Sequence, residues 1–203
     1  MKMKFKESIT REEIAVLPLR SFEGEIVVVD QPHLVSYAVK RLAGCQVVGF
    51  DTETRPTFKK GALNRVALLQ LSTSDHAFLF RINKLGLPPE IKNLLSDPKI
   101  IKPGVAIHDD IKSLQQVKRF NPGGFIELQS YARQFGIKNI SLKKLAAIVM
   151  GFRISKSQQL SNWESPELSE AQKLYAATDA WVAYKVYNCF FNNENNIELT
   201  KFE

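Results

Sequence analysis

Four segments in the first half of the chain consist largely of apolar and β-branched residues, with polar residues at their ends. Short apolar runs of this kind are typical of buried strands in a sheet. The predicted strands are residues 25–30, 46–54, 65–72 and 77–82. Because only the polar sequence Thr-Ser-Asp-His separates the third strand from the fourth, we expect these two to pair as a hairpin.

Five other segments carry apolar residues at helical spacing, three or four positions apart. They predict helices over residues 33–45, 88–97, 109–117, 141–151 and 169–191. Ser141 and Ser169 are the expected N-caps of the last two helices. Gly151 is the expected C-terminal stop of the helix that Ser141 begins.

The order of the predicted elements indicates the fold class. Residues 99–107 predict a short strand interrupted at Pro103-Gly104, and residues 124–135 predict a strand that passes into a helix. Strands that can pair as a hairpin come first, and helices then alternate with short strands. This order predicts an α/β domain with a mixed central sheet and helices on both faces.

The chain has 203 residues, the length of a single domain with a substantial core. We predict an N-terminal arm over residues 1–22 with a short helix at 10–17, one domain over 23–195 and a tail over 196–203. Its apolar runs are too short to span a membrane, and the basic N-terminus is not followed by the apolar stretch of a secretory signal. A cytoplasmic location is therefore the expectation.

The chain is basic, with 28 lysine and arginine residues against 21 acidic residues and a net charge of +7. A positive balance favours a polyanionic partner such as nucleic acid, but it does not identify one without a site. The two cysteines, Cys45 and Cys189, form no Cys-x-x-Cys pair and no zinc-ligand spacing. We expect both to be small core residues without a disulfide.

Two acidic residues follow the apolar part of the strand predicted at 46–54. Asp51 and Glu53 are two positions apart, so both side chains point to one face if the strand continues through them. Two carboxylates on one face of a buried strand repel each other unless a cation lies between them, and a divalent metal ion is well suited to oxygen ligands. The alternative is that the strand ends at Phe50 and both acids face water.

A second candidate pair lies on the predicted C-terminal helix. Tyr175 and Asp179 are four positions apart and therefore share a face of that helix. Neither lysine nor arginine occurs within one turn of Asp179, so this carboxylate has no obvious local partner. The alternative is a half-buried tyrosine beside a solvent-facing aspartate.

Two further acids, Asp109 and Asp110, stand where a predicted strand passes into a helix. Such junctions lie at the edge of a sheet, where α/β proteins form their sites. We expect Asp109 to act as an ordinary N-cap of the helix and Asp110 to be the site residue.

These motifs resemble those of the DEDD superfamily of 3′→5′ exonucleases, in the tyrosine-containing branch that includes ribonuclease D and Werner-type exonuclease domains. Asp51-Thr52-Glu53 matches the first family motif, and Tyr175-Ala-Ala-Thr-Asp179 matches the third. The second motif, an aspartate with leucine four positions later, selects Asp110 over its neighbour. The flanking sequences also resemble this group, over about residues 40 to 190. The resemblance implies an RNase H-like fold.

The resemblance further implies hydrolysis of DNA or RNA from a single-stranded 3′ end, with release of nucleoside 5′-monophosphates. Two divalent cations, Mg²⁺ or Mn²⁺, would be held by Asp51, Glu53, Asp110 and Asp179. Asp51 would bridge the two ions, Glu53 and Asp179 would complete the site of the ion that activates water, and Asp110 would bind on the side of the second ion. Tyr175 would orient the attacking water.

Other residues are weaker candidates for substrate contacts. They are basic, polar or aromatic residues near the first and third motifs: Arg55, Phe58, Lys59, Lys60, Arg153, Lys156, Gln159, Asn162 and Trp163. For each lysine an exposed face is the simpler interpretation, and for Trp163 it is packing.

The chain departs from its relatives at Gln129-Ser130, where they often carry an aspartate that is not one of the four metal-binding acids. His33, His76 and His108 all lie outside the third motif, which favours the tyrosine branch over its histidine-containing sister. One alternative is a non-catalytic nucleic-acid-binding or scaffold domain of the same fold, but the presence of all four acids and the tyrosine argues against it. Another is an endonuclease of the RNase H or integrase type, but those proteins lack the Tyr-x-x-x-Asp motif. Protein partners and the choice between DNA and RNA do not follow from the sequence.

Overall fold

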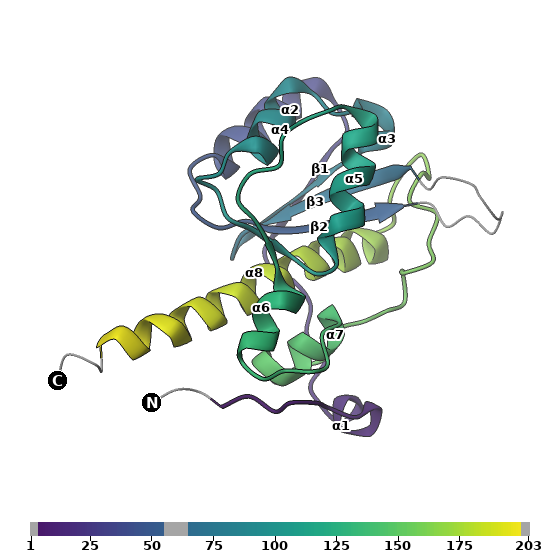
Figure 1. Cartoon of the computed structure of the whole chain (residues 1–203). Helices are drawn as coiled ribbons and strands as arrows, with labels where there is room; N and C mark the ends of the chain where they lie inside the picture. Colours follow the sequence, from purple (N-terminus) through teal and green to yellow (C-terminus); the bar gives the residue numbers. More distant parts are fainter. Residues whose placement is uncertain (1–3, 55–64, 200–203) are drawn as a thin grey trace.

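The computed structural model describes residues 4–54 and 65–199, without the side chains of residues 194–199. A four-stranded sheet lies at the centre of the molecule (Figure 1). The elements are, in chain order, α1 (Arg11–Ala15), β1 (Glu25–Val29), α2 (Pro32–Leu42), β2 (Gly49–Thr54), β3 (Val66–Ser72), β4 (His76–Phe80), α3 (Ile82–Leu85), α4 (Pro89–Ser96), β5 (Lys102–Gly104), α5 (Ile107–Val117), β6 (Phe125–Glu127), α6 (Leu128–Gln134), α7 (Leu142–Leu145), the π-helix η1 (Ala146–Met150) and α8 (Glu170–Leu199).

The sheet has the strand order β1-β4-β3-β2 and is mixed, as the sequence predicted. β1 runs parallel to β4, whereas β3 is antiparallel to both of its neighbours. β3 and β4 form the expected hairpin, in which the Thr73 main-chain nitrogen donates to the His76 carbonyl at 2.8 Å. A parallel bridge between Val47 and Ile101 joins this sheet to the parallel pair of β5 and β6.

Helices cover both faces of the sheet, which confirms the predicted α/β architecture (Figure 1). Helices α2, α4 and α5 lie on one face, and α8 crosses the other face, where it contacts β2, β3 and β4. β3 separates the two cores: Leu69 and Leu71 belong to the core with α2 and α4, while Leu68 packs with Trp163 and Tyr175 on the α8 side. Every residue of β3 is buried, which explains its largely apolar sequence.

α8 approaches the sheet most closely at Gly49, the first residue of β2. A Cβ atom added to Gly49 would lie 1.9 Å from the carbonyl oxygen of Ala180. The surface of α8 that faces the sheet is built from small side chains, since Ala176, Ala180 and Ala183 are buried. A glycine opposite alanines lets the helix lie directly on the strand.

α5 begins at Ile107, two residues before its predicted start, and the expectation that Asp109 is its N-cap is wrong. The N-cap is Ala106, which has left-handed backbone geometry with φ of 60°. Asp109 is instead exposed and forms an ion pair with Lys112 at 3.4 Å.

The capping group of α5 is the carboxylate of Glu127, twenty residues later in the chain. It accepts hydrogen bonds from the main-chain nitrogens of Ala106 and Ile107, each at 3.0 Å. It also accepts one from Gln129 at 3.0 Å, so the same side chain caps α6. Local sequence rules missed this cap because β6 brings Glu127 beside the start of α5 only in the folded chain.

Several helix ends differ from prediction. The helix predicted at 141–151 is α7 followed by the π-helix η1, and Ser141 forms no capping hydrogen bond through its side chain. Gly151 does end this segment, with φ of 71°. Ser169 caps α8 as expected, because its hydroxyl accepts from the Gln172 main chain while the Gln172 side chain accepts from the Ser169 nitrogen. The sequence pattern did not predict α3, and α8 runs to Leu199.

The N-terminal arm contains the short helix that we expected. Thr10 caps α1, and Glu13 accepts a hydrogen bond from the Thr10 main chain in return. Cys45 and Cys189 are half-buried free thiols, less enclosed than predicted. Within the part of the chain that the structure describes, no helix is long and apolar enough to cross a membrane.

The contact at Gly49 gives the first testable prediction. Gly49→Ala should lower the free energy of unfolding by about 3 kcal/mol or displace α8, because the new methyl group would overlap the Ala180 carbonyl oxygen. Urea denaturation measures the change. Gly44→Ala is the matched control, since its added Cβ would lie 3.9 Å from the nearest atom. Equal stability of the two variants would contradict close packing at Gly49.

The cap at Glu127 gives the second prediction. Glu127→Ala should lower the free energy of unfolding by about 2 kcal/mol, because it leaves three main-chain N–H groups without their acceptor. Hydrogen exchange should be faster at Ile107 and its neighbours. The control is Glu167→Ala, at an exposed position. Unchanged exchange at the start of α5 would show that Glu127 does not hold this helix.

Candidate active site

β2 presents the two acids of the first motif on one face of the sheet. The strand continues to Thr54, so the alternative that it ends at Phe50 is wrong. Asp51 pairs with Gln70 of β3, and Glu53 pairs with Leu68. Because paired residues of antiparallel strands share a face, both acids lie on the α8 side of the sheet, where Leu68 packs.

α8 brings the third motif onto the same face. Tyr175 and Asp179 are both buried, with relative exposures of 9% and 8%. One carboxylate oxygen from each of Asp51, Glu53 and Asp179 lies within 4.8 Å of the others. The structure therefore joins two motifs separated by more than a hundred residues into one acidic cluster, and the alternative of a solvent-facing aspartate on α8 is wrong.

Asp110 lies beside this cluster and is held by a hydrogen bond from β2. The Thr52 hydroxyl donates to Asp110 Oδ1 at 2.5 Å. The Thr52 main-chain nitrogen donates to Asp51 Oδ1 at 2.9 Å, so one residue contacts an acid of the first motif and the acid of the second. Asp110 is not among the three carboxylates that converge, but its negative charge acts on Asp51 and Glu53.

Burial and mutual repulsion raise the pKa values of the acids. The pKa of Asp51 is raised well above its ordinary value by burial and by the charges of Asp179, Glu53 and Asp110. Burial and the charges of Asp179 and Asp110 raise the pKa of Glu53 to about 9. Burial also raises the pKa of Asp110, against the opposing effect of the Thr52 hydrogen bond. Such a cluster is unfavourable as a set of bare carboxylates near neutral pH.

The pKa values of Tyr175 and Asp179, the two site residues of α8, are also raised. Burial raises the pKa of Asp179 to about 7, while a hydrogen bond from Tyr175 and the charge of Lys156 oppose the rise. The pKa of the Tyr175 hydroxyl is raised by burial and by the negative charges of Asp179 and Glu53. Tyr175 therefore keeps its proton near neutral pH and can donate a hydrogen bond, but it is a poor base.

The cluster forms part of the wall of a cavity of about 280 Å³. Basic and polar side chains complete the lining: Lys143, Lys156, Gln159, Ser141 and Ser155. A second cavity of about 180 Å³ shares Tyr175 and Asp179 with the first and is lined on its other side by Leu19, Arg20 and Ser21 of the N-terminal arm. Negative groups at the centre and positive groups at the rim suit a ligand whose anionic part is bound through cations.

The weaker substrate candidates divide into three groups. Lys156 and Gln159 line the cavity, as their position near the third motif suggested. Arg153 does not, because its Nε donates to the Leu17 carbonyl of the N-terminal arm at 3.0 Å. Trp163 is fully buried and packs against Tyr175 with ring centroids 6.0 Å apart, so it is a packing residue.

Asn162 does not line this cavity either, and it takes part in the loop before α8. Its main-chain carbonyl accepts hydrogen bonds from Ser165 and Gln172. The remaining candidates lie outside the described residues: Arg55, Phe58, Lys59 and Lys60.

The histidines and the departure at 129–130 have no contact with the cluster in the structure. His108 is exposed on the first turn of α5. Gln129 donates through its side chain to the Ile140 carbonyl at 3.3 Å, and Ser130 is exposed. The Gln129 side chain thus ties α6 to the segment before α7 and leaves the acids unchanged.

Sequence reasoning missed four residues around the site. Thr52 and Glu127 position Asp110 and the helix that carries it. Lys143 lines the cavity. Gln70 is fully buried beside Asp51, and neither side-chain polar atom has a hydrogen-bond partner among the described residues. For Gln70 the available signal was a polar residue inside a largely apolar strand.

The donor set fits hard divalent cations. The three converging groups are all carboxylates, the ligands that Mg²⁺ and Mn²⁺ prefer. Asp179 Oδ1 is buried and has no hydrogen-bond partner among the described residues. A buried carboxylate oxygen without a proton donor is expected where a cation binds, because an unpaired charge in the interior is unfavourable. The residues present therefore fit a divalent metal site.

Comparisons with known proteins identify the family of this chain. A family model described as 3'-5' exonuclease matches residues 26–193. Over 205 residues the chain is 33% identical to the bifunctional 3'-5' exonuclease/ATP-dependent helicase WRN of Mus musculus, with 92% of this chain and 15% of that protein covered. The chain thus spans a small part of the length of this relative.

Two solved structures show the shared fold. The Aedes aegypti Nibbler EXO domain superposes with a TM-score of 0.78 at 23% identity, covering 88% of this chain and 94% of that one. Escherichia coli RNase D superposes with a TM-score of 0.77 at 20% identity, covering 85% and 46%. The RNase H-like fold is thereby confirmed. Together with the match over residues 26–193, these findings show that the chain belongs to the 3'-5' exonuclease domain family.

Proposed function

We propose that this chain is a metal-dependent exonuclease of the tyrosine-containing DEDD branch, which removes nucleoside 5′-monophosphates from the 3′ end of a single strand of DNA or RNA. The observation that carries the proposal is the convergence of Asp51, Glu53 and Asp179 within 4.8 Å in a cavity that basic residues line. A cytoplasmic location is part of the same proposal, and fractionation of cells expressing the full-length protein tests it.

Asp51, Glu53 and Asp179 would hold the divalent cations, with Asp110 contributing on the side nearer α5. Two such ions, Mg²⁺ or Mn²⁺, supply a nucleophile at neutral pH and neutralise charge on the leaving oxygen. Thr52 keeps Asp110 oriented through its short hydrogen bond, and its main chain restrains one oxygen of Asp51. The acids act as oriented ligands. Burial and mutual repulsion raise their pKa values, and bound cations would offset that repulsion.

Tyr175 would orient the attacking water. Its hydroxyl is adjacent to Asp179, and burial together with the negative charges of Asp179 and Glu53 raises its pKa, so it stays protonated near neutral pH. Trp163 packs against the tyrosine ring, and the Arg81 guanidinium holds the loop that carries Trp163 through the Ser165 carbonyl. A fixed hydroxyl can direct one lone pair of the water toward the scissile phosphorus without accepting its proton.

The rim of the cavity would bind the terminal nucleotides. Lys143 and Lys156 can neutralise phosphate groups, and Gln159 can donate hydrogen bonds to phosphate or sugar oxygens. Because phosphate groups are common to DNA and RNA, these contacts do not distinguish between the two. Escherichia coli RNase D, which shares the fold, is described as an exoribonuclease involved in structured RNA processing.

Removal of one acid tests the central role of the cluster. Asp51→Asn should reduce Mn²⁺-dependent shortening of a 5′-labelled strand by roughly a thousandfold or more, because the metal site supplies several kcal/mol of transition-state stabilisation. EDTA should have the same effect on the unmodified protein. Asp109→Asn, at the exposed neighbour of Asp110, is the matched control and should retain activity.

The products distinguish the alternatives. A ladder that shortens from the 3′ end with release of nucleoside 5′-monophosphates supports the proposal. Internal cuts would favour an endonuclease. An intact strand that nevertheless binds would favour a nucleic-acid-binding domain that lacks catalysis.

Tyr175 has its own test. Tyr175→Phe should lower kcat by roughly a hundredfold and leave KM almost unchanged, because the hydroxyl orients the water and does not hold the substrate. Single-turnover kinetics separate the two parameters. Tyr184→Phe, on the same helix but outside the cavity lining, is the control. A rise in KM with constant kcat would contradict the assigned role.

Stability in EDTA should depend on pH. The pKa values of Asp179 and Glu53 rise on folding from 3.8 and 4.5 to about 7 and about 9. Raised pKa values in the folded state mean that the unfolded chain releases protons more readily, so stability should fall as pH increases from about 4 to about 9. Urea denaturation in EDTA measures the decline, and Mn²⁺ should reverse it by replacing the protons.

The control for this pH dependence is Asp51→Asn. With one charge removed from the cluster, the metal-free variant should be more stable than the unmodified protein at pH 8, yet Mn²⁺ should stabilise it much less. A flat pH dependence in the unmodified protein, or equal stabilisation of both proteins by Mn²⁺, would contradict a repulsive cluster that binds metal.

A further inference from the structure

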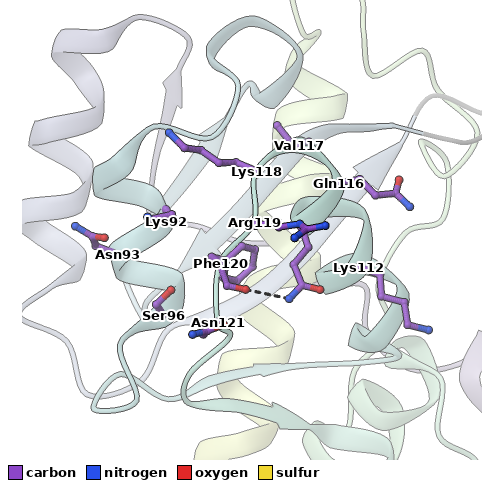
Figure 2. Close-up of a pocket in the computed structure, with 11 residues that line it drawn as sticks. Lys92, Asn93, Ser96, Lys112, Gln116, Val117, Lys118, Arg119, Phe120 and Asn121 are labelled. Carbon is purple, nitrogen blue, oxygen red and sulfur yellow. Dashed lines mark hydrogen bonds between the residues drawn. The ribbon is translucent and has the colours of Figure 1, made fainter.

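A large cavity lies away from the acidic cluster, between α4 and the C-terminal end of α5. It has a volume of about 1040 Å³ and is the one drawn in Figure 2. We refer to it as the basic cavity, and its lining residues are Lys92, Asn93, Ser96, Lys112, Gln115, Gln116, Val117, Lys118, Arg119, Phe120 and Asn121. The catalytic proposal uses none of them.

The charges in the basic cavity are all of one sign. Four of its lining residues are lysine or arginine, and none is acidic. Lys112 forms an ion pair with the exposed Asp109 at 3.4 Å, which in water is weak. For Lys92, Lys118 and Arg119, no ion pair with a described carboxylate occurs. Several uncompensated cations around one hollow favour a polyanion.

The uncharged part of the lining suits phosphate and sugar better than bases. Asn93, Gln116 and Asn121 are exposed amides that can donate hydrogen bonds. The aromatic residue, Phe120, is buried in the core with a relative exposure of 7% and offers no face on which a base could stack. The chemistry of the cavity therefore matches a nucleic-acid backbone, read without regard to sequence.

The wall of the basic cavity is held by contacts within the fold. The Gln115 side chain donates to the Phe120 carbonyl at 3.0 Å, the bond drawn as a dashed line in Figure 2. The following turn packs directly on the end of α4, because the Gly123 nitrogen donates to the Leu95 carbonyl at 3.1 Å. A Cβ on Gly123 would lie 2.3 Å from the Ser96 carbonyl oxygen. The cations are thus presented by fixed backbone.

α5 connects the basic cavity with the acidic cluster. Asp110 is in its first turn and Gln116 near its end, six residues apart, which is about 9 Å along the helix. A strand with one phosphate per roughly 3.4 Å would cover that distance in about three nucleotides. A strand with its 3′ end at the acids can therefore extend along α5 to the basic cavity.

On the basis of the proposed exonuclease function, we propose that the basic cavity binds the sugar–phosphate backbone of the substrate strand, several nucleotides from the 3′ end being cleaved. Contacts there strengthen the binding of long strands and contribute nothing to a substrate that is too short to reach them. Binding is independent of base sequence and sensitive to salt.

The test compares two double charge reversals. Lys118→Glu with Arg119→Glu alters the basic cavity, and Lys40→Glu with Lys99→Glu alters two exposed lysines outside its lining. Each pair lowers the net charge of +7 by four units, two per reversal, so general electrostatics is matched. Circular dichroism melts confirm that each variant is folded, and Lys92→Glu, on the opposite wall, provides an independent change.

Fluorescence anisotropy of a labelled 20-nucleotide strand in EDTA measures binding between 50 and 200 mM salt. The cavity variant should bind about tenfold more weakly than the control variant at low salt. The slope of log Kd against log salt should fall by about 1.4, which is about 0.7 for each phosphate that the variant no longer neutralises. Hydrolysis of a dinucleotide, which is too short to reach the cavity from the acids, should be unchanged with Mn²⁺.

Equal affinity and equal salt slopes for the cavity and control variants would overturn the proposal and leave the basic cavity to another anionic partner. Loss of dinucleotide hydrolysis in the folded cavity variant would also overturn it, because the cavity would then act on the chemistry. If the unmodified protein cleaves no strand at all, the exonuclease function fails, while the binding comparison still decides whether the cavity holds nucleic acid.

Discussion

The structure depends on the direct contact of one helix with one strand. Gly49 has no side chain and α8 presents alanines to it, so that Ala180 lies against the start of β2. Two residues further along the strand, Asp51 then faces Asp179 of the helix. Apolar packing thus forces carboxylates together that would otherwise separate, and the free energy that the core provides opposes their repulsion. A larger residue at Gly49 would separate the two halves of the site.

Without cations the carboxylates of the acidic cluster repel one another, whereas bound cations would offset this repulsion. Its members have raised pKa values because each is buried and lies near the others. Such shifts are common at functional sites, and here they favour the binding of cations. Burial and the charges of Asp179 and Glu53 also raise the pKa of the Tyr175 hydroxyl, which is therefore protonated near neutral pH. Thr52 and Glu127 act at a distance from the reaction, one on the Asp110 carboxylate and the other on the start of its helix. The proposed ligands, the proposed water-orienting tyrosine and the residues that support them therefore come from β2, α5, β6 and α8.

Much of this could be predicted from the sequence, because periodicity reports local geometry. The spacing of Asp51 and Glu53 placed both on one face of β2, and the spacing of Tyr175 and Asp179 placed both on one face of α8. Contacts between distant segments were not predictable in this way. Asp109 met the local rule for an N-cap, but Glu127 caps α5 from another strand. The sequence suggested a substrate contact for Arg153, but its guanidinium group donates a hydrogen bond to Leu17 of the N-terminal arm. The lysine and arginine side chains of the basic cavity could not be grouped from the sequence, because α4 and the end of α5 lie side by side only in the folded chain.

The most direct measurement of the central claim is anomalous diffraction from a crystal soaked in Mn²⁺. The account predicts two anomalous peaks in the cavity, one of them within coordination distance of Asp51, Glu53 and Asp179, with Asp51 in contact with both ions. It also predicts that these peaks disappear in Asp51→Asn crystals soaked in the same way. Well-ordered carboxylates with no manganese beside Asp51 would contradict the assignment of this cluster as the metal centre.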